Sequence, residues 1–278
     1  MTNQAGPIIA QTTVKRRFIA CTQSTGRIGK STVAEGLIGW LRYAGVAFVA
    51  VDADSQHQTL SHRYPCDVES FDATKTLDDF ARMIQALPDF PVILVDFPAQ
   101  ATNFLLSAAE HFRLLEFFER SGIRPTLLIF AADDPTAKES ASKTVRFFGN
   151  AADYLLVENP AKYKSDDFTR TPLAKWLAER ETPKLRVPAV TAITISAWEA
   201  LERKLNRYLP LDEACRQNGL HELCRHELGF LRDRFLVQFE DLADRMLPDP
   251  ALIKNKVARL TERKADVEDA LNDPFLVS

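Results

Sequence analysis

The chain has 278 residues, of which 46% are hydrophobic and 26% are charged, and its formal net charge at pH 7 is −3. This length accommodates one large α/β domain or one domain with an appendage, and the composition is ordinary for a globular protein. The slight negative charge argues against nucleic-acid binding over the whole surface, although it leaves room for a local basic patch.

Neither a membrane span nor a leader is indicated. No stretch of the sequence reaches the roughly 18 consecutive apolar residues that a membrane-spanning helix requires. Residues 1–16 lack the apolar core of a signal peptide and are expected to form a flexible N-terminus. The cysteines form no C-x-x-C pair, which favours a reduced, cytoplasmic protein. They are Cys21, Cys66, Cys215 and Cys224.

From residue 17 onward, apolar runs alternate with segments of helical periodicity. The predicted strands are residues 17–21, 46–51, 92–96, 126–131 and 153–157, with a last short strand within 187–195. The predicted helices begin at residue 30 and then cover 76–87, 104–120, 136–148 and 168–180. Residues 60–74 show no clear period and are expected to form a loop. Continuous apolar strands alternating with helices predict a doubly wound, mostly parallel sheet with helices on both faces.

After residue 195 the strand pattern ends and only helical periodicity continues. One helix is expected around residues 198–209, a long helical stretch at 211–246 with a break near Gly219 or Gly229, and a highly charged helix at 251–271. The sequence therefore predicts an α/β domain over residues 17–195 and a C-terminal helical extension over 196–278, packed on that domain or on a partner.

The octapeptide Thr-Gly-Arg-Ile-Gly-Lys-Ser-Thr, residues 25–32, connects the first predicted strand to the first predicted helix. Glycines let backbone N–H groups approach an anion, and the helix N-terminus adds its dipole. In a loop of this kind the lysine, here Lys30, reaches the β- and γ-phosphates, and the hydroxyl of Ser31 holds Mg²⁺. The segment therefore predicts a phosphate-binding loop.

The match to known phosphate-binding loops is incomplete. The general pattern G-x-x-x-x-G-K-[ST] needs a glycine where Ser24 stands. The variant K-G-G-x-G-K-[ST] fits at Gly26, Gly29, Lys30 and Ser31, but Thr25 replaces its first lysine and Arg27 its second glycine.

Polar residues follow several of the predicted strands, where the carboxyl ends of parallel strands meet. They are Asp54, Asp96, Asp134 and Asn159. Asp96 is placed to orient Mg²⁺ through water, and Asp54 to hold the attacking water or the metal shell. Asn159 either contacts a nucleotide base through its amide or forms a plain turn before Pro160; the sequence leaves both open.

Three segments together resemble the ParA/MinD family of deviant Walker A P-loop ATPases, a branch of the SIMIBI class. They are residues 25–32, the segment Asp52-Ala-Asp-Ser-Gln56, which is similar to the family's D-x-D-P-Q switch, and Asp96-Phe-Pro98, which is similar to its D-x-P strand end. The resemblance covers about residues 17–195. It implies that this part is a P-loop NTPase domain.

The resemblance also implies cofactors and site residues, with ATP and Mg²⁺ as the cofactors. The nucleotide-binding residues would be Thr25, Gly26, Arg27, Ile28, Gly29, Lys30, Ser31, Thr32 and Asn159. The metal ligands would be Ser31, Asp54 and Asp96, and the catalytic residues Lys30 and Asp54.

The implied function is a nucleotide-dependent dimerisation switch. ATP-bound chains would pair as homodimers and separate after slow, partner-stimulated hydrolysis, positioning, partitioning or transferring DNA or a protein complex. Within the family, the branches that serve plasmid maintenance or conjugation are the most similar in general character. The partner protein would contact the switch region or the C-terminal helices. Thr25 stands where the family has the lysine that reaches across the dimer.

Two other functions remain open from the sequence. The same loop would serve a P-loop small-molecule kinase or a dethiobiotin-synthetase-like ligase, or the chain would be a hydrolysis-deficient interaction module. No motif fixes ATP against GTP.

Overall fold

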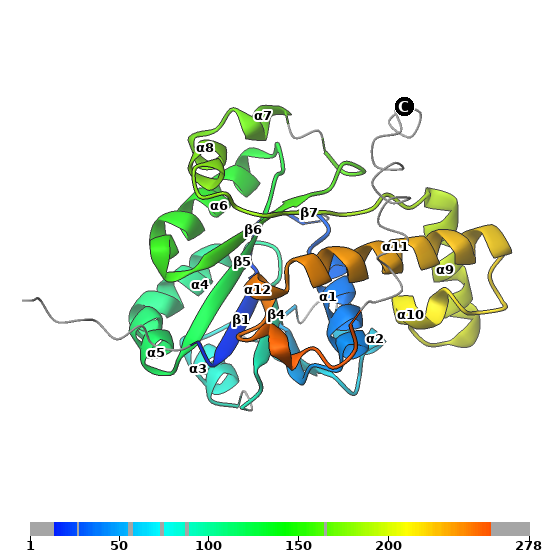
Figure 1. The fold of residues 1–278 in the computed structure, drawn as a ribbon, viewed down its shortest axis with the longest axis horizontal. Coiled ribbons are helices and arrows are strands. Elements are labelled where there is room, and N and C mark those ends of the chain that lie inside the picture. Colours follow the sequence, from blue (N-terminus) through cyan, green and yellow to red (C-terminus); the bar gives the residue numbers. More distant parts are fainter. Residues whose placement is uncertain are drawn as a thin grey trace, which may run out of the picture.

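The computed structural model describes residues 14–26, 28–54, 58–72, 75–86, 89–163 and 166–256. In this part of the chain, seven parallel strands form one sheet with the order β3-β2-β4-β1-β5-β6-β7 (Figure 1). The strands are β1 (Arg16–Cys21), β2 (Phe48–Asp52), β3 (Val68–Ser70), β4 (Val92–Asp96), β5 (Ile123–Phe130), β6 (Asp153–Glu158) and β7 (Lys184–Arg186).

The central strands are buried on both faces, which explains why their apolar runs are continuous rather than alternating. An apolar core lies on each face of the sheet. These features confirm the predicted doubly wound α/β fold of the P-loop NTPase type with a C-terminal helical region.

The helices divide between the two faces. One face carries α3 (Leu77–Ala86), α4 (Ala101–His111), α5 (Leu114–Arg120), α6 (Pro135–Phe148), α7 (Asp166–Thr169) and α8 (Pro172–Ala178). The other carries α1 (Lys30–Ala44), α2 (Thr59–Arg63), α9 (Ala192–Leu205), α10 (Leu211–Ala214), α11 (Glu222–Asp241) and α12 (Ala243–Met246). Short 3₁₀ turns cover Gly149–Ala151 and Pro250–Leu252.

Crossover handedness explains this division. From β1 the chain moves outward to β2 and β3, with α1 and α2 in the connections, and from β3 it returns across the sheet toward β7. Because parallel crossovers are almost always right-handed, a reversal of direction moves the connecting helices to the opposite face. Helices α3 to α8 therefore share one face, and α1 and α2 alone would leave the other face bare over β5, β6 and β7.

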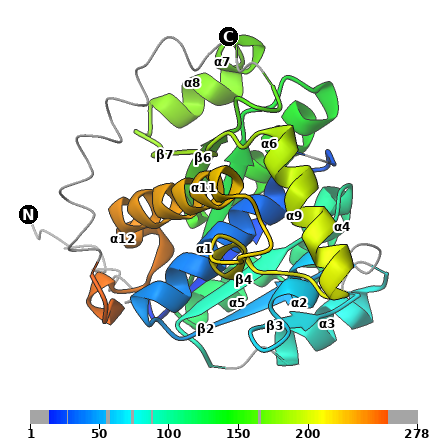
Figure 2. The ribbon, with the colours of Figure 1, turned by 90° about the vertical axis from the view of Figure 1, so that its right-hand side faces the viewer.

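The C-terminal helices cover this bare half of the sheet. Figure 2 shows α11 beside α1 on the same face, and the buried side chains of both helices belong to one core with those of β5, β6 and β7. A Cβ at Gly36 of α1 would lie 2.7 Å from ring carbons of Phe235, so the missing side chain allows α11 to cross α1 closely. The side-chain amide of Gln238 accepts a hydrogen bond from the Arg186 N–H at 2.7 Å and donates one to the Arg186 carbonyl oxygen at 2.9 Å. It thereby provides hydrogen-bond partners for backbone groups of the edge strand β7.

Several local predictions are wrong. Residues 60–74 contain α2 and β3 rather than only a loop, and the helix expected at 104–120 is split, with Arg113 at φ 50° between α4 and α5. The strand expected within 187–195 is instead β7 at 184–186, followed by α9. The stretch 211–246 breaks near Gly219, as one alternative stated, whereas Gly229 lies inside α11.

The predicted domain division stays a prediction, and its boundary at 195/196 lies within α9. The flexible terminus expected at 1–16 falls largely on residues 1–13, and the helix expected at 251–271 largely on 257–278; both ranges lie outside the described residues. Among the described helices, none combines the length and the apolar character that crossing a membrane requires.

Candidate phosphate-binding site

The loop between β1 and α1 lies at the point where the strand order reverses. β1 is paired with β4 on one side and with β5 on the other. From β1 the chain continues toward β2, whereas from the neighbouring β4 it crosses in the opposite direction to β5. In open α/β sheets, ligands bind beyond the carboxyl ends of the strands at this switch point. The register aligns the ends of the strands, with Asp96 opposite both Cys21 and Asp52.

The Lys30 ammonium group lies inside the curve of the loop. Its Nζ donates hydrogen bonds to the backbone oxygens of Gln23 at 3.1 Å and Thr25 at 3.0 Å. Burial lowers the pKa of this lysine, and the charge of Asp96 opposes the shift. Among the described residues, the hydrogen-bond partners of this buried ammonium group are carbonyl oxygens, so it is suited to receive an anion at this position.

Gly29 is required at its position for two separate reasons. Its φ of 99° lies in the left-handed region, where a side chain is strained, and it is the N-cap residue directly before α1. A Cβ on Gly29 would also lie 2.7 Å from the Asn159 amide nitrogen. The loop therefore needs glycine here for both its backbone turn and the close approach of Asn159, which follows β6.

Ser31 and Asp96 form the polar pair expected of a magnesium site. The Ser31 hydroxyl donates to Asp96 Oδ2 at 2.7 Å, whereas the buried Oδ1 has no hydrogen-bond partner among the described residues. Burial raises the pKa of Asp96 to about 7, and the hydrogen bond from Ser31 and the charge of Lys30 counteract this. A hydroxyl next to a carboxylate with an unpaired oxygen is a donor set that fits Mg²⁺.

The two aspartates after β2 have different environments. Asp52 is buried and its Oδ2 accepts the backbone N–H groups of Leu60, at 3.0 Å, and Ser61, at 3.1 Å, at the start of α2. Asp54 is half-buried. Its negative charge favours the protonated forms of Lys30 and Asp96, so it opposes the lowering of the Lys30 pKa and adds to the raising of the Asp96 pKa. The side chain expected to hold water or metal thus lies within electrostatic range of the Ser31–Asp96 pair.

Asn159 is turned toward the loop backbone. Its amide nitrogen donates to the Ile28 carbonyl oxygen at 3.1 Å, and the Tyr163 hydroxyl donates to the same oxygen. Asn159 is buried beside Gly29. In this structure the amide therefore fixes the second half of the loop.

The remaining predicted loop residues lie at the mouth of the site or outside the described part. The Thr25 hydroxyl donates to Asp134 Oδ1 at 2.8 Å, and the same oxygen accepts the Ala137 N–H that begins α6. Gly26 and Thr32 are exposed, while Ile28 is buried. Arg27 lies outside the described residues.

Gln23 and Tyr163 were missed by the sequence analysis. The buried Gln23 amide accepts from Phe130 N at 2.6 Å and donates to the oxygens of Phe130, at 2.9 Å, and Ala137, at 3.1 Å. These bonds tie the first half of the loop to β5 and α6, just as Asn159 and Tyr163 tie the second half. The one signal for Gln23 was its polar side chain two residues after an apolar strand.

A cavity of about 860 Å³ lies away from the loop, between α1, α10 and α11. Its walls include Gly39 and Arg42 from the second half of α1, Asp212 from α10 and Arg232 from α11, and none of its lining residues belongs to the loop. The candidate phosphate-binding site is therefore defined by its polar contacts at the strand ends, and this cavity is separate from it.

Similarity to known proteins is low throughout. No protein-family model and no curated protein sequence matches the chain. Among solved structures, FlhF complexed with GMPPNP and Mg²⁺ aligns with a TM-score of 0.39 at 14% identity, over 63% of this chain and 67% of that one. Chloroplast FtsY from Physcomitrella patens aligns with a TM-score of 0.40 at 11% identity, over 63% of this chain and 59% of that one.

The signal recognition particle receptor FtsY from Elizabethkingia anophelis aligns with a TM-score of 0.40 at 12% identity, over 64% of this chain and 60% of that one. The alignments to the two FtsY proteins thus span less than two thirds of their length. The assignment of the P-loop NTPase fold rests on the strand order and on the loop between β1 and α1.

Proposed function

We propose that this chain binds a nucleoside triphosphate with Mg²⁺ at the loop between β1 and α1 and hydrolyses it. The observation that supports this most is the unpaired, buried Oδ1 of Asp96 beside the Ser31 hydroxyl, next to an ammonium group enclosed by the loop. A buried carboxylate oxygen without a partner is costly, and a bound cation with its water would satisfy it.

Each residue has a definite task in this proposal. Lys30 binds the β- and γ-phosphates in place of the carbonyl oxygens it now contacts, and Ser31 and Asp96 hold the metal. Asp54 orients water near the terminal phosphate. Bound Mg²⁺ would supply charge neutralisation at the phosphates.

We further propose that the triphosphate is ATP and that its binding drives a ParA/MinD-like homodimerisation switch in the cytoplasm. The support is the sequence pattern of residues 25–32, 52–56 and 96–98. In this proposal a partner protein at the switch or the C-terminal helices stimulates turnover, and the cargo is DNA or a protein complex in partition, positioning or transfer.

The switch is tested by the mass of the protein in solution with Mg²⁺ and ADP, ATP, GTP or a non-hydrolysable ATP analogue, measured by light scattering. We expect the analogue to double the mass and ADP to leave it unchanged. Lys30→Ala should abolish the response, whereas Lys175→Ala, an exposed lysine on α8, should keep it. A mass that no nucleotide alters would refute the switch.

A nucleotide-binding interaction module without turnover is the second candidate, favoured by one contact. Thr25, at the position of the family's cross-dimer lysine, is engaged with Asp134. Phosphate release from saturating Mg-ATP separates the two functions, because the module predicts binding with no release above that of Lys30→Ala.

A further inference from the structure

A second cavity, of about 250 Å³, lies at the amino-terminal end of the strands, opposite the end that carries the phosphate-binding loop. It lies at the beginning of β5 and β6, because Arg124 is the second residue of β5 and Asp153 the first of β6. Its walls also contain Arg180 and Arg245 from beyond α8 and from α12. Three arginines from separate parts of the chain therefore line one small space.

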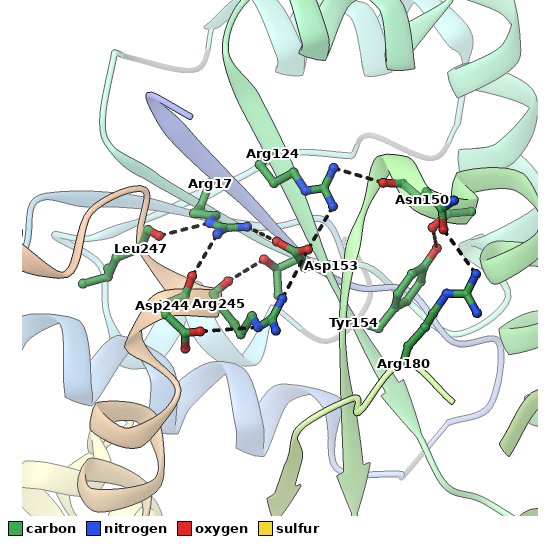
Figure 3. A network of polar contacts seen from close by, with 11 residues as sticks. Arg17, Arg124, Asn150, Asp153, Tyr154, Arg180, Asp244, Arg245 and Leu247 are labelled. Atoms are coloured by element: carbon green, nitrogen blue, oxygen red, sulfur yellow. Dashed lines mark hydrogen bonds and ion pairs between the residues drawn. The ribbon is translucent and has the colours of Figure 1, made fainter. Parts of the chain in front are cut away.

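A single carboxylate is shared by several of these arginines, as Figure 3 shows. Asp153 pairs with Arg17, with Arg124 at 2.9 Å and with Arg245 at 3.6 Å. Burial alone would raise the pKa of Asp153, but the hydrogen bonds from Arg124 and Arg17 hold it below its usual value. Asp153 is thus ionised and already engaged by two close guanidinium groups.

Arg17 and Arg124 are held by further backbone contacts. Arg17 is buried and donates to the backbone oxygens of Asp244 at 2.9 Å and Leu247 at 3.1 Å, while Arg124 donates to the Asn150 oxygen at 3.1 Å. The Arg17 contacts fasten the end of the C-terminal helices to the sheet (Figure 3). Arg124 is therefore a structural part of the cavity wall, and Arg17 holds Asp153 from outside the lining.

Arg180 and Arg245 are held more loosely. Arg180 stacks on the Trp176 ring at 3.6 Å, and its guanidinium donates to Asn150 Oδ1 at 3.3 Å, without an acidic partner among the described residues. Within the described part of the chain, the ion pairs of Arg245 are the 3.6 Å pair with Asp153 and a 3.5 Å pair with Asp244, whose side chain is 65% exposed. Both guanidinium groups can turn toward a ligand at little cost.

The cavity carries an excess of positive charge. Among its described lining residues, Asp153 provides the one carboxylate against the guanidinium groups of Arg124, Arg180 and Arg245, and Arg17 already occupies its other oxygen. Like charges in a partly buried space repel one another more strongly than in water. An anion in the cavity would relieve this repulsion.

We propose that this cavity is a second anion site, separate from the nucleotide site, that binds the phosphate group of a small phosphate monoester. Guanidinium groups match the oxygens of a phosphate through paired hydrogen bonds, and the Thr182 hydroxyl adds a further polar group to the wall. The small volume fits one phosphate group rather than a polymer. The inference does not depend on the function proposed for the loop at the other edge.

Titration calorimetry with inorganic phosphate and with phenyl phosphate, at constant ionic strength set by chloride, tests this proposal. The double variant Arg180→Gln/Arg245→Gln should weaken binding by about tenfold or more, because it removes two charge-assisted hydrogen-bond donors to the phosphate. The matched control Arg120→Gln/Arg203→Gln removes the same charge from exposed positions and should bind as the wild type does. Melting without phosphate verifies that both variants fold.

The loop at the opposite edge also attracts phosphate, so the titrations are repeated in Lys30→Ala. Binding that survives this change and depends on Arg180 and Arg245 supports the second site. Phosphate affinity that is equal in the double variant and its control, or that disappears with Lys30→Ala alone, overturns it. Flotation with phosphatidylcholine vesicles, with and without phosphatidic acid, distinguishes the two sources of the phosphate group. If the protein floats with the phosphatidic acid vesicles and this depends on Arg180 and Arg245, the phosphate is that of a lipid headgroup. If the protein does not float with them, the phosphate is that of a soluble ester.

Discussion

Asp96 is the most unusual titratable group of the site because it is buried next to an ammonium group and yet has a pKa near neutrality. Burial raises its pKa to about 7 from an ordinary value of 3.8, against the effect of Ser31 and Lys30. The protein without nucleotide and metal is therefore close to a balance between the protonated and the ionised carboxyl group. Binding of Mg²⁺ would favour the ionised form, since metal ligands must be deprotonated.

This balance predicts a pH dependence of stability. Between the two pKa values the folded state binds more protons than the unfolded state, so the contribution of Asp96 to the free energy of unfolding falls as pH rises from about 4 to about 7. Asp96→Asn should remove this falling contribution, so that the unfolding free energy of the variant increases relative to that of the wild type as pH rises from about 4 to about 7. Urea denaturation at several pH values, with a chelator and without nucleotide, measures it.

The difference between the pH profiles of the wild type and Asp96→Asn separates the contribution of Asp96 to the unfolding free energy from the contributions of other buried acids. Burial also raises the pKa of Glu35, which is present in both proteins and cancels in the comparison. Identical pH slopes for the wild type and Asp96→Asn would show that Asp96 is ionised throughout, contrary to this account.

At the residue scale, the site was predictable where chemistry is encoded locally. Gly29, Lys30 and Ser31 follow a spacing that the loop itself imposes, and the position of Asp96 follows from the end of a strand. Gln23 and Tyr163 were not predictable, because their partners Phe130 and Ile28 are more than 100 residues away along the chain. The role of each is set by tertiary packing.

At the scale of elements, two glycines of α1 make contrasting contributions. Gly36 is overlain by Phe235 of α11, whereas a Cβ at Gly39 would meet no atom within 4 Å. Glycine in a helix interior is less favourable than alanine by about 1 kcal/mol. Close packing of two helices explains Gly36, and nothing in the packing requires Gly39.

The two positions should therefore respond in opposite directions to a side chain. Gly36→Val should lower the free energy of unfolding by about 2 kcal/mol or more, because α11 must move away from α1. Gly39→Ala should raise it by about 0.5–1 kcal/mol. Urea unfolding of both variants measures this, and equal tolerance of the two substitutions would contradict the close crossing of α1 and α11.

The wrong element predictions have specific physical causes. The β-branched residues near 187–195 favour a strand, but Thr191 accepts the Thr194 N–H at 3.3 Å as a helix cap and contacts Glu227 of α11 at 2.7 and 2.8 Å. That tertiary contact is invisible to local periodicity. The break before α5 has no glycine or proline to reveal it, because Arg113 itself takes the left-handed conformation.

At the scale of the whole molecule, the C-terminal helices are a layer of the α/β fold. The Phe239 ring of α11 is buried and lies 5.9 Å from the Trp40 ring of α1. Arg17 of β1 binds one backbone oxygen within α12 and one directly after it. The sequence predicted a helical extension but could not show which face it covers, since that follows from the direction of the crossovers.

Shared burial predicts that the sheet and the C-terminal helices unfold together. Phe239→Ala should lower the free energy of unfolding by about 3–5 kcal/mol. Phe230→Ala, on the same helix but 39% exposed, should change it little. Circular dichroism and tryptophan fluorescence should give coincident transitions in both variants. Two separate transitions, with the helices melting first, would show that the extension is an independent unit.

The central claim is that the loop between β1 and α1 holds a nucleoside triphosphate with its magnesium ion. Titration calorimetry of the full chain with ATP and with GTP, each with and without Mg²⁺, tests it most directly. We expect one triphosphate per chain, an affinity that increases with Mg²⁺ in the wild type but not in Asp96→Asn, and no measurable binding to Lys30→Ala. Absence of binding by both nucleotides to the wild type, or equal binding to Lys30→Ala, would contradict the account.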